Sequence, residues 1–598
     1  MPLPVTDPLQ TSNDNDYFNR FKASKVLVLF IFVFILILIF LGKISMTILA
    51  DRSSPSTIKT TQNKAKRGAI ISSDGYAVAS TQKVYKAIIN TKNLDPDKKN
   101  LFITLFSIYS GVDQKSIKTK IAATKGRVIL SYNIDAQKAK HLKALAHKLL
   151  RLKVFKRYET PDKHLILQGL DVLESGETRS YPYSDLLTPV VGYIHKYEED
   201  DYTRVNGIKG IENSYQELLE TRTNGKKQAE RDVNNYLIMN KASTFLPTQD
   251  GPNLILNIPI ELQRRTEHML SMSKKAYNAK EILCAIMDSK TGKLLVLATS
   301  NRFDPKAIRK SDYASLNANA IEYTFEPGSV IKPLVFAKLL EKKKITTQDI
   351  INTHNGRYKM GNNIITDAHK SRYLSAENVI VHSSNIGMAQ MVQKLGAIEL
   401  RQGLLDFGLT QLSHLDLPYE KKGSLPSVSK LSNKVYKATT SYGYGLLVNF
   451  MQLLKAYNVF NNNGDMVRPR IVSFLQKNGT KAALSQNLVE SALEPEIAQR
   501  MKKILIKAVV EGTGIAASFP GLEIGGKTGT AHIAENGTYV KKYNSSFFGF
   551  ANDKKNRYTL GVTVIEPNEH VYFAATSAVP IFKKLTELLI EFEYLKPQ

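Results

Sequence analysis

The sequence predicts an α+β domain in the C-terminal half of the chain, preceded by a separate N-terminal module and one transmembrane helix. At 598 residues the chain is too long for one ordinary domain. Strand-like alternation occurs at both ends of residues 250–598, and helical patterns lie between them. This order is typical of an α+β domain whose sheet is completed by the C-terminus. A charge-free apolar run near the N-terminus predicts the membrane anchor.

The apolar run covers Val26 to Gly42. Its seventeen residues would rise about 25 Å as a helix, close to the lower limit for crossing a bilayer. Arg20, Lys22 and Lys25 precede it, which favours a cytoplasmic N-terminus. A cleaved signal peptide is disfavoured, because a polar leader of about 20 residues precedes the run and no small-x-small cleavage site follows. We therefore predict a cytoplasmic tail at 1–21, a transmembrane helix at 22–42 and a chain that is otherwise outside the cytoplasm.

Charge and cysteine content restrict the partners. Lys and Arg total 82 against 54 Asp and Glu, a formal net charge of +28. Such a balance fits nucleic acid, an anionic membrane surface or an anionic polymer, and the predicted compartment excludes nucleic acid. The single cysteine, Cys284, rules out an intramolecular disulfide and a cysteine-based zinc cluster. No metal and no cofactor are expected.

The N-terminal module is predicted at 67–245, after a polar linker at 43–66. Asp74-Gly75 lies between two apolar-alternating stretches and predicts a β-hairpin. Residues 136–152 show helical periodicity with a Lys-rich outer face.

The C-terminal domain is predicted at 250–598, and its elements follow from periodicity. We expect strands at 253–258, 282–288, 293–299, 545–551 and 558–565, and helices at 261–272 and 581–592.

The first candidate motif is Glu326 to Pro333 (EPGSVIKP). A helix beginning near Ser329 would place Ser329 and Lys332 on one face, since they are three residues apart. A serine becomes nucleophilic when a base takes its proton, and a lysine can serve if burial and nearby cations lower its pKa. Alone, this pattern also fits an ordinary capped helix with an exposed lysine.

Two further motifs follow in the same domain. Ser383-Ser384-Asn385 offers a hydroxyl and an amide two residues apart, although in isolation a polar turn is the simpler interpretation. Gly525 to Ala531 (GGKTGTA) reads as an edge strand whose glycines allow close approach of a substrate. Lys527 supplies positive charge there, and Thr528 and Thr530 supply hydroxyls.

Residues 521–528 (GLEIGGKT) also fit the P-loop pattern of nucleotide-binding proteins. A P-loop requires a buried strand before it and a helix after it, whereas this segment is expected to continue as an extended strand. We therefore reject nucleotide binding.

Taken together, the three motifs resemble those of penicillin-binding transpeptidases and serine β-lactamases. The Glu-Pro-Gly lead-in to Ser329 is similar to class B penicillin-binding proteins of the septal type. The resemblance extends over nearly the whole chain and includes 207–212, 443–445, 511–514 and 544–550. It implies an antiparallel sheet flanked by helices, a helical subdomain and an N-terminal pedestal. The chain departs from the family at Ser72-Ser73, Asn449-Phe450 and residues 256–259, outside the three motifs.

The resemblance also implies roles. Ser329 would attack the D-Ala-D-Ala bond of a peptidoglycan stem peptide, Lys332 would act as its base, and Ser383 would relay the proton. Backbone N–H groups of Ser329 and Thr530 would form an oxyanion hole. Lys527 is expected to be a fourth catalytic residue, which also helps to hold the terminal carboxylate. The expected substrate-binding residues are Asn385, Thr528, Gly529 and Thr530.

The implied protein is a monofunctional D,D-transpeptidase inhibited by β-lactams, anchored in the bacterial inner membrane with a periplasmic catalytic domain. Expected partners are stem peptides, a separate glycan polymerase and division-complex proteins. An elongation-specific transpeptidase is the main alternative. A β-lactamase, a penicillin-sensing receptor and a silent scaffold are disfavoured, because the chain carries an N-terminal module, a single span and all three motifs.

Overall fold

The computed structural model describes residues 14–49, 58–159, 163, 165–199, 202–231, 237–484 and 489–598. The chain divides into two compact units: Met1–Asn63 with Gly225–Pro247, and Lys64–Asn224 with Thr248–Gln598.

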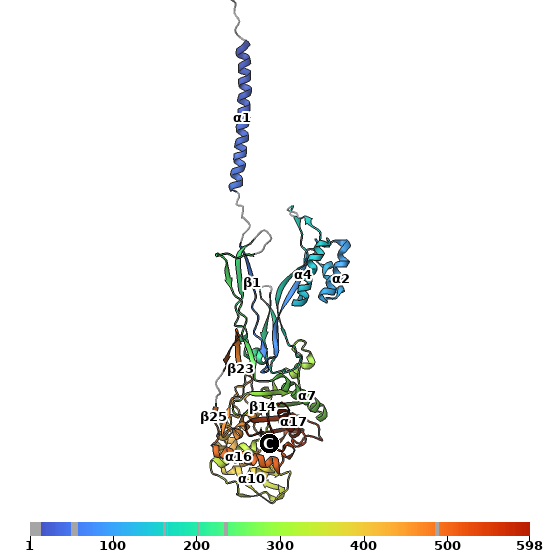
Figure 1. Cartoon of the computed structure of the whole chain (residues 1–598). Coiled ribbons are helices and arrows are strands. Elements are labelled where there is room, and N and C mark those ends of the chain that lie inside the picture. Colours follow the sequence, from blue (N-terminus) through green and yellow to red (C-terminus); the bar gives the residue numbers. More distant parts are fainter. Residues whose placement is uncertain are drawn as a thin grey trace, which may run out of the picture. The chain divides into compact units, whose positions relative to one another are not determined.

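The first unit contains helix α1 (Asp14–Leu49) (Figure 1). Within the described residues, Ser24–Leu49 is the one helical stretch long and apolar enough to cross a membrane. Its 26 residues rise about 39 Å, more than a bilayer core requires. Helix α1 as a whole extends beyond the predicted span of 22–42 at both ends, whereas its apolar stretch begins at Ser24 and extends beyond the span only at the C-terminal end. Residues 1–13 of the predicted tail lie outside the described part of the chain.

The predicted linker at 43–66 is wrong in part, because residues 58–63 form strand β1 (Ile58–Asn63). This strand pairs along its whole length with β10 (Gly225–Arg231), which also pairs with β11 (Leu237–Ile238) and β12 (Thr244–Leu246). The pairing partner lies far along the chain, so the local turn-prone composition carries no signal of it.

The second unit contains a large mixed sheet that both halves of the chain build. Among the described residues, its strands run in the order β24-β23-β13-β2-β3-β7-β9-β8, and β4 pairs with β3. From the N-terminal module come β2 (Ile70–Ile71), β3 (Ala77–Asn90), β4 (Arg127–Asp135), β7 (Asp171–Ser180), β8 (Ile194–Glu199) and β9 (Tyr202–Gly207). From the C-terminal half come β13 (Asn253–Leu256), β23 (Val472–Lys477) and β24 (Thr480–Ala483). The Asp74-Gly75 hairpin joins β2 and β3 as predicted, with Gly75 at φ 89°.

A buried ion network joins three segments of this module: the stretch before β2, strand β7 and helix α5 (Gly210–Ser214). The Arg67 guanidinium lies 2.9 Å from the Glu212 carboxylate, and Arg179 lies 2.7 Å from its other oxygen. All three side chains are fully buried. Burial alone would raise the pKa of Glu212, but the two guanidinium groups outweigh it and hold that pKa below its ordinary value.

A helical lobe extends from the same sheet and is called the basic lobe (residues 92–157) below. It contains α2 (Lys99–Ser110), α3 (Gln114–Ala123) and α4 (Ala136–Arg151), with β4 between α3 and α4 (Figure 1). Helix α4 confirms the helix predicted at 136–152. Its inward residues Leu142, Leu145 and Leu149 join a separate core beneath the helices.

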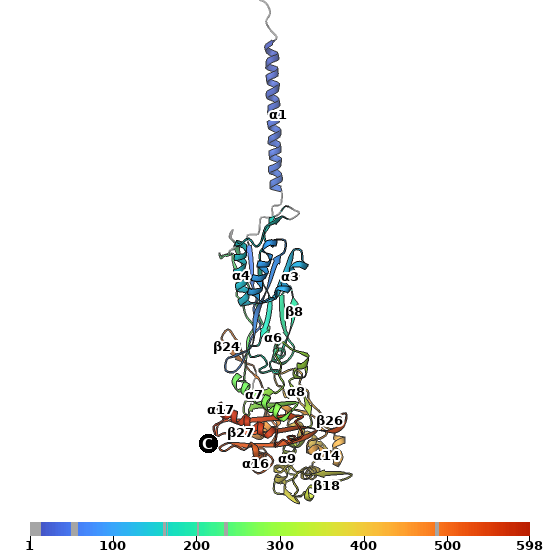
Figure 2. The same ribbon diagram turned by 90° about the vertical axis from the view of Figure 1, so that its right-hand side faces the viewer.

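The catalytic half is built on an antiparallel sheet with the order β15-β14-β28-β27-β26 in the described chain. Its strands are β14 (Glu281–Asp288), β15 (Leu294–Thr299), β26 (Glu523–Glu535), β27 (Thr538–Asn552) and β28 (Arg557–Ile565). Successive side chains of β14 alternate between two cores: Ile282 and Cys284 face one, and Leu283 and Ala285 face the other. The sheet is therefore covered on both sides, as Figure 2 shows.

Helices α7 (Ile260–Tyr277) and α17 (Ala578–Glu591) cover one face of this sheet. Helices α15 (Phe450–Asn461) and α16 (Pro495–Val510) contact β27, β28 and β26 on the other face. The expected α+β fold, its helical covering and its completion by the C-terminal strands are confirmed. Strand β26 lies at the edge, so the third motif is on an edge strand.

A helical region carries the second motif. It includes α10 (Ala376–Val381), α11 (Asn385–Met391) and α14 (Lys434–Ser441), with the hairpin of β18 (Arg357–Met360) and β19 (Asn363–Thr366) beside α11.

Candidate active site

Ser329 lies at the start of a helix that follows a tight turn. A 3₁₀ turn, η3 (Gly328–Ile331), leads directly into α9 (Lys332–Glu341), with Pro333 in the first turn where a missing N–H is tolerated. Ser329 is half-buried, and its hydroxyl makes no hydrogen bond within the described chain. Lys332 is one turn further on and is completely buried.

The Lys332 amine contacts the second motif. Its Nζ donates to the Ser383 backbone oxygen at 2.7 Å, to Asn385 Oδ1 at 2.7 Å and to Ser383 Oγ at 3.2 Å. Burial lowers the pKa of Lys332 to about 7, although the nearby Asp367 carboxylate opposes this shift. A substantial fraction of the amine is therefore neutral near pH 7 and able to take a proton.

Ser383 occupies a conformation that non-glycine residues rarely adopt. Its φ is 61° at the junction between α10 and α11. Backbone in this left-handed region costs on the order of 1–3 kcal/mol when a side chain is present. The turn directs both the carbonyl and the hydroxyl of Ser383 at Lys332, so the strained backbone sets the position of the amine.

Asp367 supports that turn, and sequence reasoning missed it. Its carboxylate accepts from the backbone N–H of Asn385 at 2.6 Å and of Ile386 at 3.0 Å, and from the Ser384 hydroxyl at 2.5 Å. It therefore caps α11 while it also lies close enough to Lys332 to affect its charge. No local pattern marks this residue, because its partners lie on another element.

The third motif lies against η3, the turn that carries Ser329 and is called the nucleophile turn below. Strand β26 contacts η3, and a Cβ on Gly529 would come within 2.8 Å of Val330 Cγ1 and 3.0 Å of the Pro327 oxygen. Only glycine allows this approach of strand and turn. The expected role of glycine in this motif, close backbone approach, thus has a direct geometric basis.

Lys527 is completely buried on β26. Its Nζ donates to the Thr528 oxygen at 3.1 Å and to Thr528 Oγ1 at 3.3 Å. Burial, and secondarily the charge of Lys332, hold the pKa of Lys527 well below its ordinary value. The two lysines are therefore neighbours in one electrostatic environment. Thr528 Oγ1 also contacts Thr513 Oγ1 at 2.7 Å, which ties residues 511–514 to this strand.

The Thr530 hydroxyl accepts from the Ala574 N–H at 3.1 Å. With this residue, the structure brings every predicted site residue to one place: Ser329 and Lys332 on the η3–α9 helix, Ser383 and Asn385 at the α10–α11 turn, and Lys527, Thr528, Gly529 and Thr530 on β26. Strand β26 continues beyond Thr528 to Glu535, so the helix that a P-loop requires does not follow this segment, in agreement with the sequence prediction.

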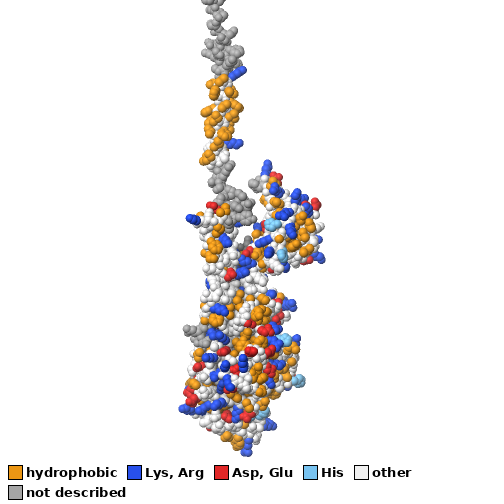
Figure 3. Space-filling view, in the orientation of Figure 1, with side chains coloured by type: hydrophobic (Ala, Val, Ile, Leu, Met, Phe, Trp, Pro, Cys, Tyr) orange, Lys and Arg blue, Asp and Glu red, His pale blue; other side chains and the backbone are white. Residues whose placement is uncertain are grey.

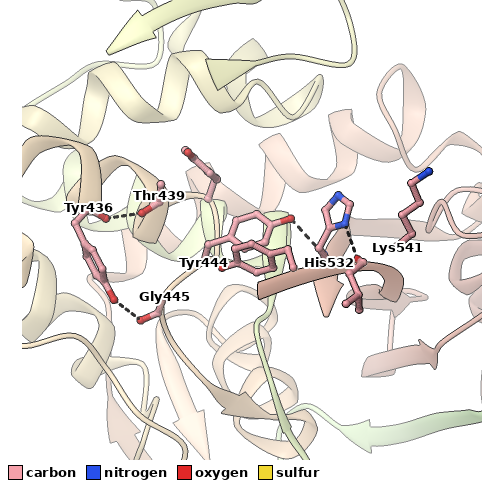
Figure 4. Close-up of a pocket in the computed structure, with 9 residues that line it drawn as sticks. Tyr436, Thr439, Tyr444, Gly445, His532 and Lys541 are labelled. Carbon is pink, nitrogen blue, oxygen red and sulfur yellow. Dashed lines mark hydrogen bonds between the residues drawn. The ribbon is translucent and has the colours of Figure 1, made fainter. Parts of the chain in front are cut away.

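A tyrosine-lined pocket of about 600 Å³ adjoins this centre. Figure 4 shows Tyr436 and Thr439 from α14, Tyr444 and Gly445 from the following loop, and His532 and Lys541 from the β26–β27 hairpin. The pocket continues from the nucleophile turn, because the Gly328 N–H donates to the Gly443 oxygen at 3.1 Å.

Glu326 connects the nucleophile turn to the pocket wall. Its Oε1 accepts from the Gly445 N–H at 2.7 Å and from the Tyr539 hydroxyl at 3.1 Å. Its other oxygen, Oε2, is buried and has no hydrogen-bond partner in the described structure, and burial raises the pKa of this carboxyl. The sequence pattern singled out Glu326 but did not reveal these contacts.

A half-buried serine beside two completely buried lysines, at the edge of an antiparallel sheet, defines a serine acyl-transfer enzyme. Residues 282–587 match the family model for the penicillin binding protein transpeptidase domain, and residues 62–256 match that for the penicillin-binding protein dimerisation domain. The first match alone covers more than half of the chain. The protein belongs to the penicillin-binding protein transpeptidase family.

Relatives agree with this assignment. The chain is 28% identical to "Peptidoglycan D,D-transpeptidase FtsI" of Buchnera aphidicola subsp. Baizongia pistaciae, over 93% of this chain and 92% of the relative. It is 28% identical to "Probable peptidoglycan D,D-transpeptidase PenA" of Neisseria gonorrhoeae, over 69% and 68%.

Solved structures share the fold. Penicillin Binding Protein 2X from Streptococcus thermophilus aligns with a TM-score of 0.73 at 18% identity, over 90% of this chain and 81% of that chain. A peptidoglycan synthetase from Bifidobacterium adolescentis aligns with a TM-score of 0.67 at 19% identity, over 90% and 98%.

Proposed function

We propose that this protein is a monofunctional peptidoglycan D,D-transpeptidase that cross-links stem peptides at the division septum. The observation that carries the proposal is the completely buried Lys332 amine, held by Ser383 and Asn385 one helical turn from Ser329. The names of the relatives and the Glu-Pro-Gly lead-in support the substrate and the septal role.

In the proposed reaction, Ser329 Oγ attacks the carbonyl of the penultimate D-Ala while neutral Lys332 takes the hydroxyl proton. The peptide C–N bond then breaks, and Ser383 passes a proton to the departing D-Ala amine. The product is an ester between Ser329 and the stem peptide. A second stem peptide's amine attacks this ester, forms the cross-link and returns the proton to Ser329.

Substrate recognition is assigned to the edge strand and the adjoining pocket. Lys527, Thr528 and Thr530 hold the terminal carboxylate, and Asn385 holds the substrate amide. Backbone N–H groups of Ser329 and Thr530 stabilise the oxyanion, a contribution typically of about 3–4 kcal/mol per donor. The tyrosine-lined pocket receives part of the stem peptide. A β-lactam acylates the same serine.

Location and partners complete the proposal. The N-terminus is cytoplasmic, α1 crosses the inner membrane once, and the catalytic half lies in the periplasm. A separate glycan polymerase supplies the strands to be cross-linked, and division-complex proteins bring the two enzymes together.

The test uses the full chain in detergent with a fluorescent penicillin. We expect one labelled peptide, carrying the dye on Ser329, and no label on Ser329→Ala. Ser311→Ala, an exposed serine before the motif, is the matched control and should label normally. Label on a different residue, or normal labelling of Ser329→Ala, would overturn the assignment of the nucleophile.

Two further assays distinguish transfer from hydrolysis, and a septal role from a role in elongation. With nascent glycan from an added polymerase, cross-linked dimers are expected, whereas trimmed monomers alone would indicate a hydrolase. Depletion in cells should give filaments, and round cells would assign the protein to elongation.

A further inference from the structure

The basic lobe (residues 92–157) carries a charge imbalance that the reaction does not use. It contains sixteen Lys and Arg against four Asp, a net charge of +12 out of +28 for the chain. Three of those aspartates are helix caps: Asp95 for the 3₁₀ turn before α2, Asp113 for α3 and Asp135 for α4. The acidic groups therefore hold helix ends in place, and the outward charge of the lobe is cationic.

Helix α2 interrupts this charged surface. No charged residue occurs from Asn100 to Val112, and the helix is apolar on both sides. Phe102, Ile103 and Phe106 are buried beneath it. Leu101 and Ile108 lie on the opposite face and are 46% and 69% exposed, while Leu105 between them is partly buried against the same core.

Cationic side chains stand at both ends of this apolar face. At its N-terminal end, Lys98 Nζ donates to the backbone oxygen of Leu152, whose side chain is itself exposed. At its C-terminal end, Lys138 lies against Gly111. Figure 3 shows hydrophobic side chains at the position of α2 with Lys and Arg around them.

An apolar helix face surrounded by lysines is complementary to the headgroup region of an anionic bilayer. Apolar side chains enter the headgroup region while lysines bind anionic headgroups. A hydrated anionic polymer would form ion pairs with the lysines but would leave the apolar side chains of Leu101 and Ile108 in contact with water. A second copy of the lobe would bring two surfaces of net +12 together and be repelled. Helix α1 is long and apolar enough to cross a membrane, and as an anchor it would keep the chain where a bilayer is present at high effective concentration.

We propose that the outer face of α2, with the lysines around it, is a docking surface for anionic phospholipid headgroups. This inference does not depend on the proposed enzymatic function.

The test places a dye on this face in the full chain reconstituted in nanodiscs. Cys284 is the only cysteine and is completely buried, so Ile108→Cys carries the one accessible thiol for an environment-sensitive dye. Ile398→Cys is the matched control, because Ile398 is also a helical isoleucine with 69% exposure. We expect a blue shift at position 108 in phosphatidylglycerol-containing discs, little shift in phosphatidylcholine discs, and none at position 398 in either.

High salt should reverse the shift, and so should the charge reversals Lys115→Glu, Lys118→Glu and Lys140→Glu combined. These three lysines are exposed on α3 and α4, the helices that contact α2. Fluorescent-penicillin labelling at the normal level would show that the variant is folded. Water-like emission at position 108 in anionic discs would overturn the proposal. An equal shift in both disc types would do the same, as would a shift that appears only when another protein is added.

Discussion

The Nζ of Lys332 lies 2.7 Å from the backbone oxygen of Ser383, in a turn where Ser383 has a φ of 61°. Two oxygen acceptors at this distance favour the charged amine, whereas complete burial favours the neutral one. Burial prevails, and the pKa of Lys332 falls to about 7. The amine is thus held in place by hydrogen bonds, while a substantial fraction of it is neutral near pH 7.

This balance predicts the pH dependence of acylation. The base is active only without its proton, so the rate of penicillin acylation should rise as pH increases through about 7 and then level off. Stopped-flow measurements across pH 5.5–9 would check it. Lys332→Arg keeps the charge but cannot lose its proton, and we expect a loss of about 10²–10⁴-fold at all these pH values. A flat profile in the unsubstituted protein would contradict the assignment.

Asp367→Asn should shift this profile towards lower pH. The carboxylate of Asp367 raises the pKa of Lys332, so its removal lets the amine lose its proton more easily. The same change leaves one accepting oxygen where the carboxylate has two, so one of its hydrogen bonds at the start of α11 is lost and the plateau rate should fall. A merely structural role would reduce the rate without moving the midpoint. Asp349→Asn, which changes an aspartate beside Lys394, is the control.

Gly529→Ala should separate strand β26 from the nucleophile turn. The new methyl group would meet Val330 and Pro327 at 2.8 and 3.0 Å, and a displacement of about 1 Å near a reacting group can cost about 10²-fold in rate. We expect slow acylation with nearly normal thermal stability. Gly396→Ala, where the nearest atom is 3.4 Å away, should acylate normally. Equal rates in the two variants would contradict the close-packing argument.

Glu212→Gln should destabilise the N-terminal module. It leaves the buried guanidinium groups of Arg67 and Arg179 without their counter-charge, at a cost of about 3–5 kcal/mol. Thermal unfolding should show a large decrease in melting temperature. Glu261→Gln removes an exposed partner of Arg264 and should cost less than about 1 kcal/mol.

The same carboxylate makes stability depend on pH. Because the pKa of Glu212 is lowered from 4.5, its contribution is fully present above that value and lost as pH falls below it. Unfolding curves between pH 3 and 6 should therefore converge for the unsubstituted protein and Glu212→Gln at the acid end. A difference that stays constant over this range would contradict the electrostatic explanation.

Sequence reasoning succeeded where the signal is local. The apolar run from Ile282 to Met287 predicted a buried strand, and the three-residue spacing of Ser329 and Lys332 predicted a shared helix face. Resemblance then linked these residues to Ser383, Asn385 and Lys527, which the structure brings together.

What the sequence could not provide depends on contacts between distant segments. Asp367 supports Lys332 and α11 from another element, and Glu326 reaches Gly445 and Tyr539 across the fold. Strand β1 was mistaken for part of a linker because its partner β10 lies far along the chain. Such pairings are determined by tertiary packing, which leaves no local pattern.

The sheet built by both halves of the chain has a consequence for how this protein can be divided or recombined. Strand β13 pairs with β2 on one side and with β23 on the other, so segments near residues 70, 255 and 475 form one continuous set of backbone hydrogen bonds. A gene exchange that replaced only residues after 257 would import a foreign β23 against a resident β13. Functional hybrid proteins should therefore inherit β13 and β23 from the same parent. A fragment beginning at residue 258 would lack β13 and leave that edge of β23 unpaired.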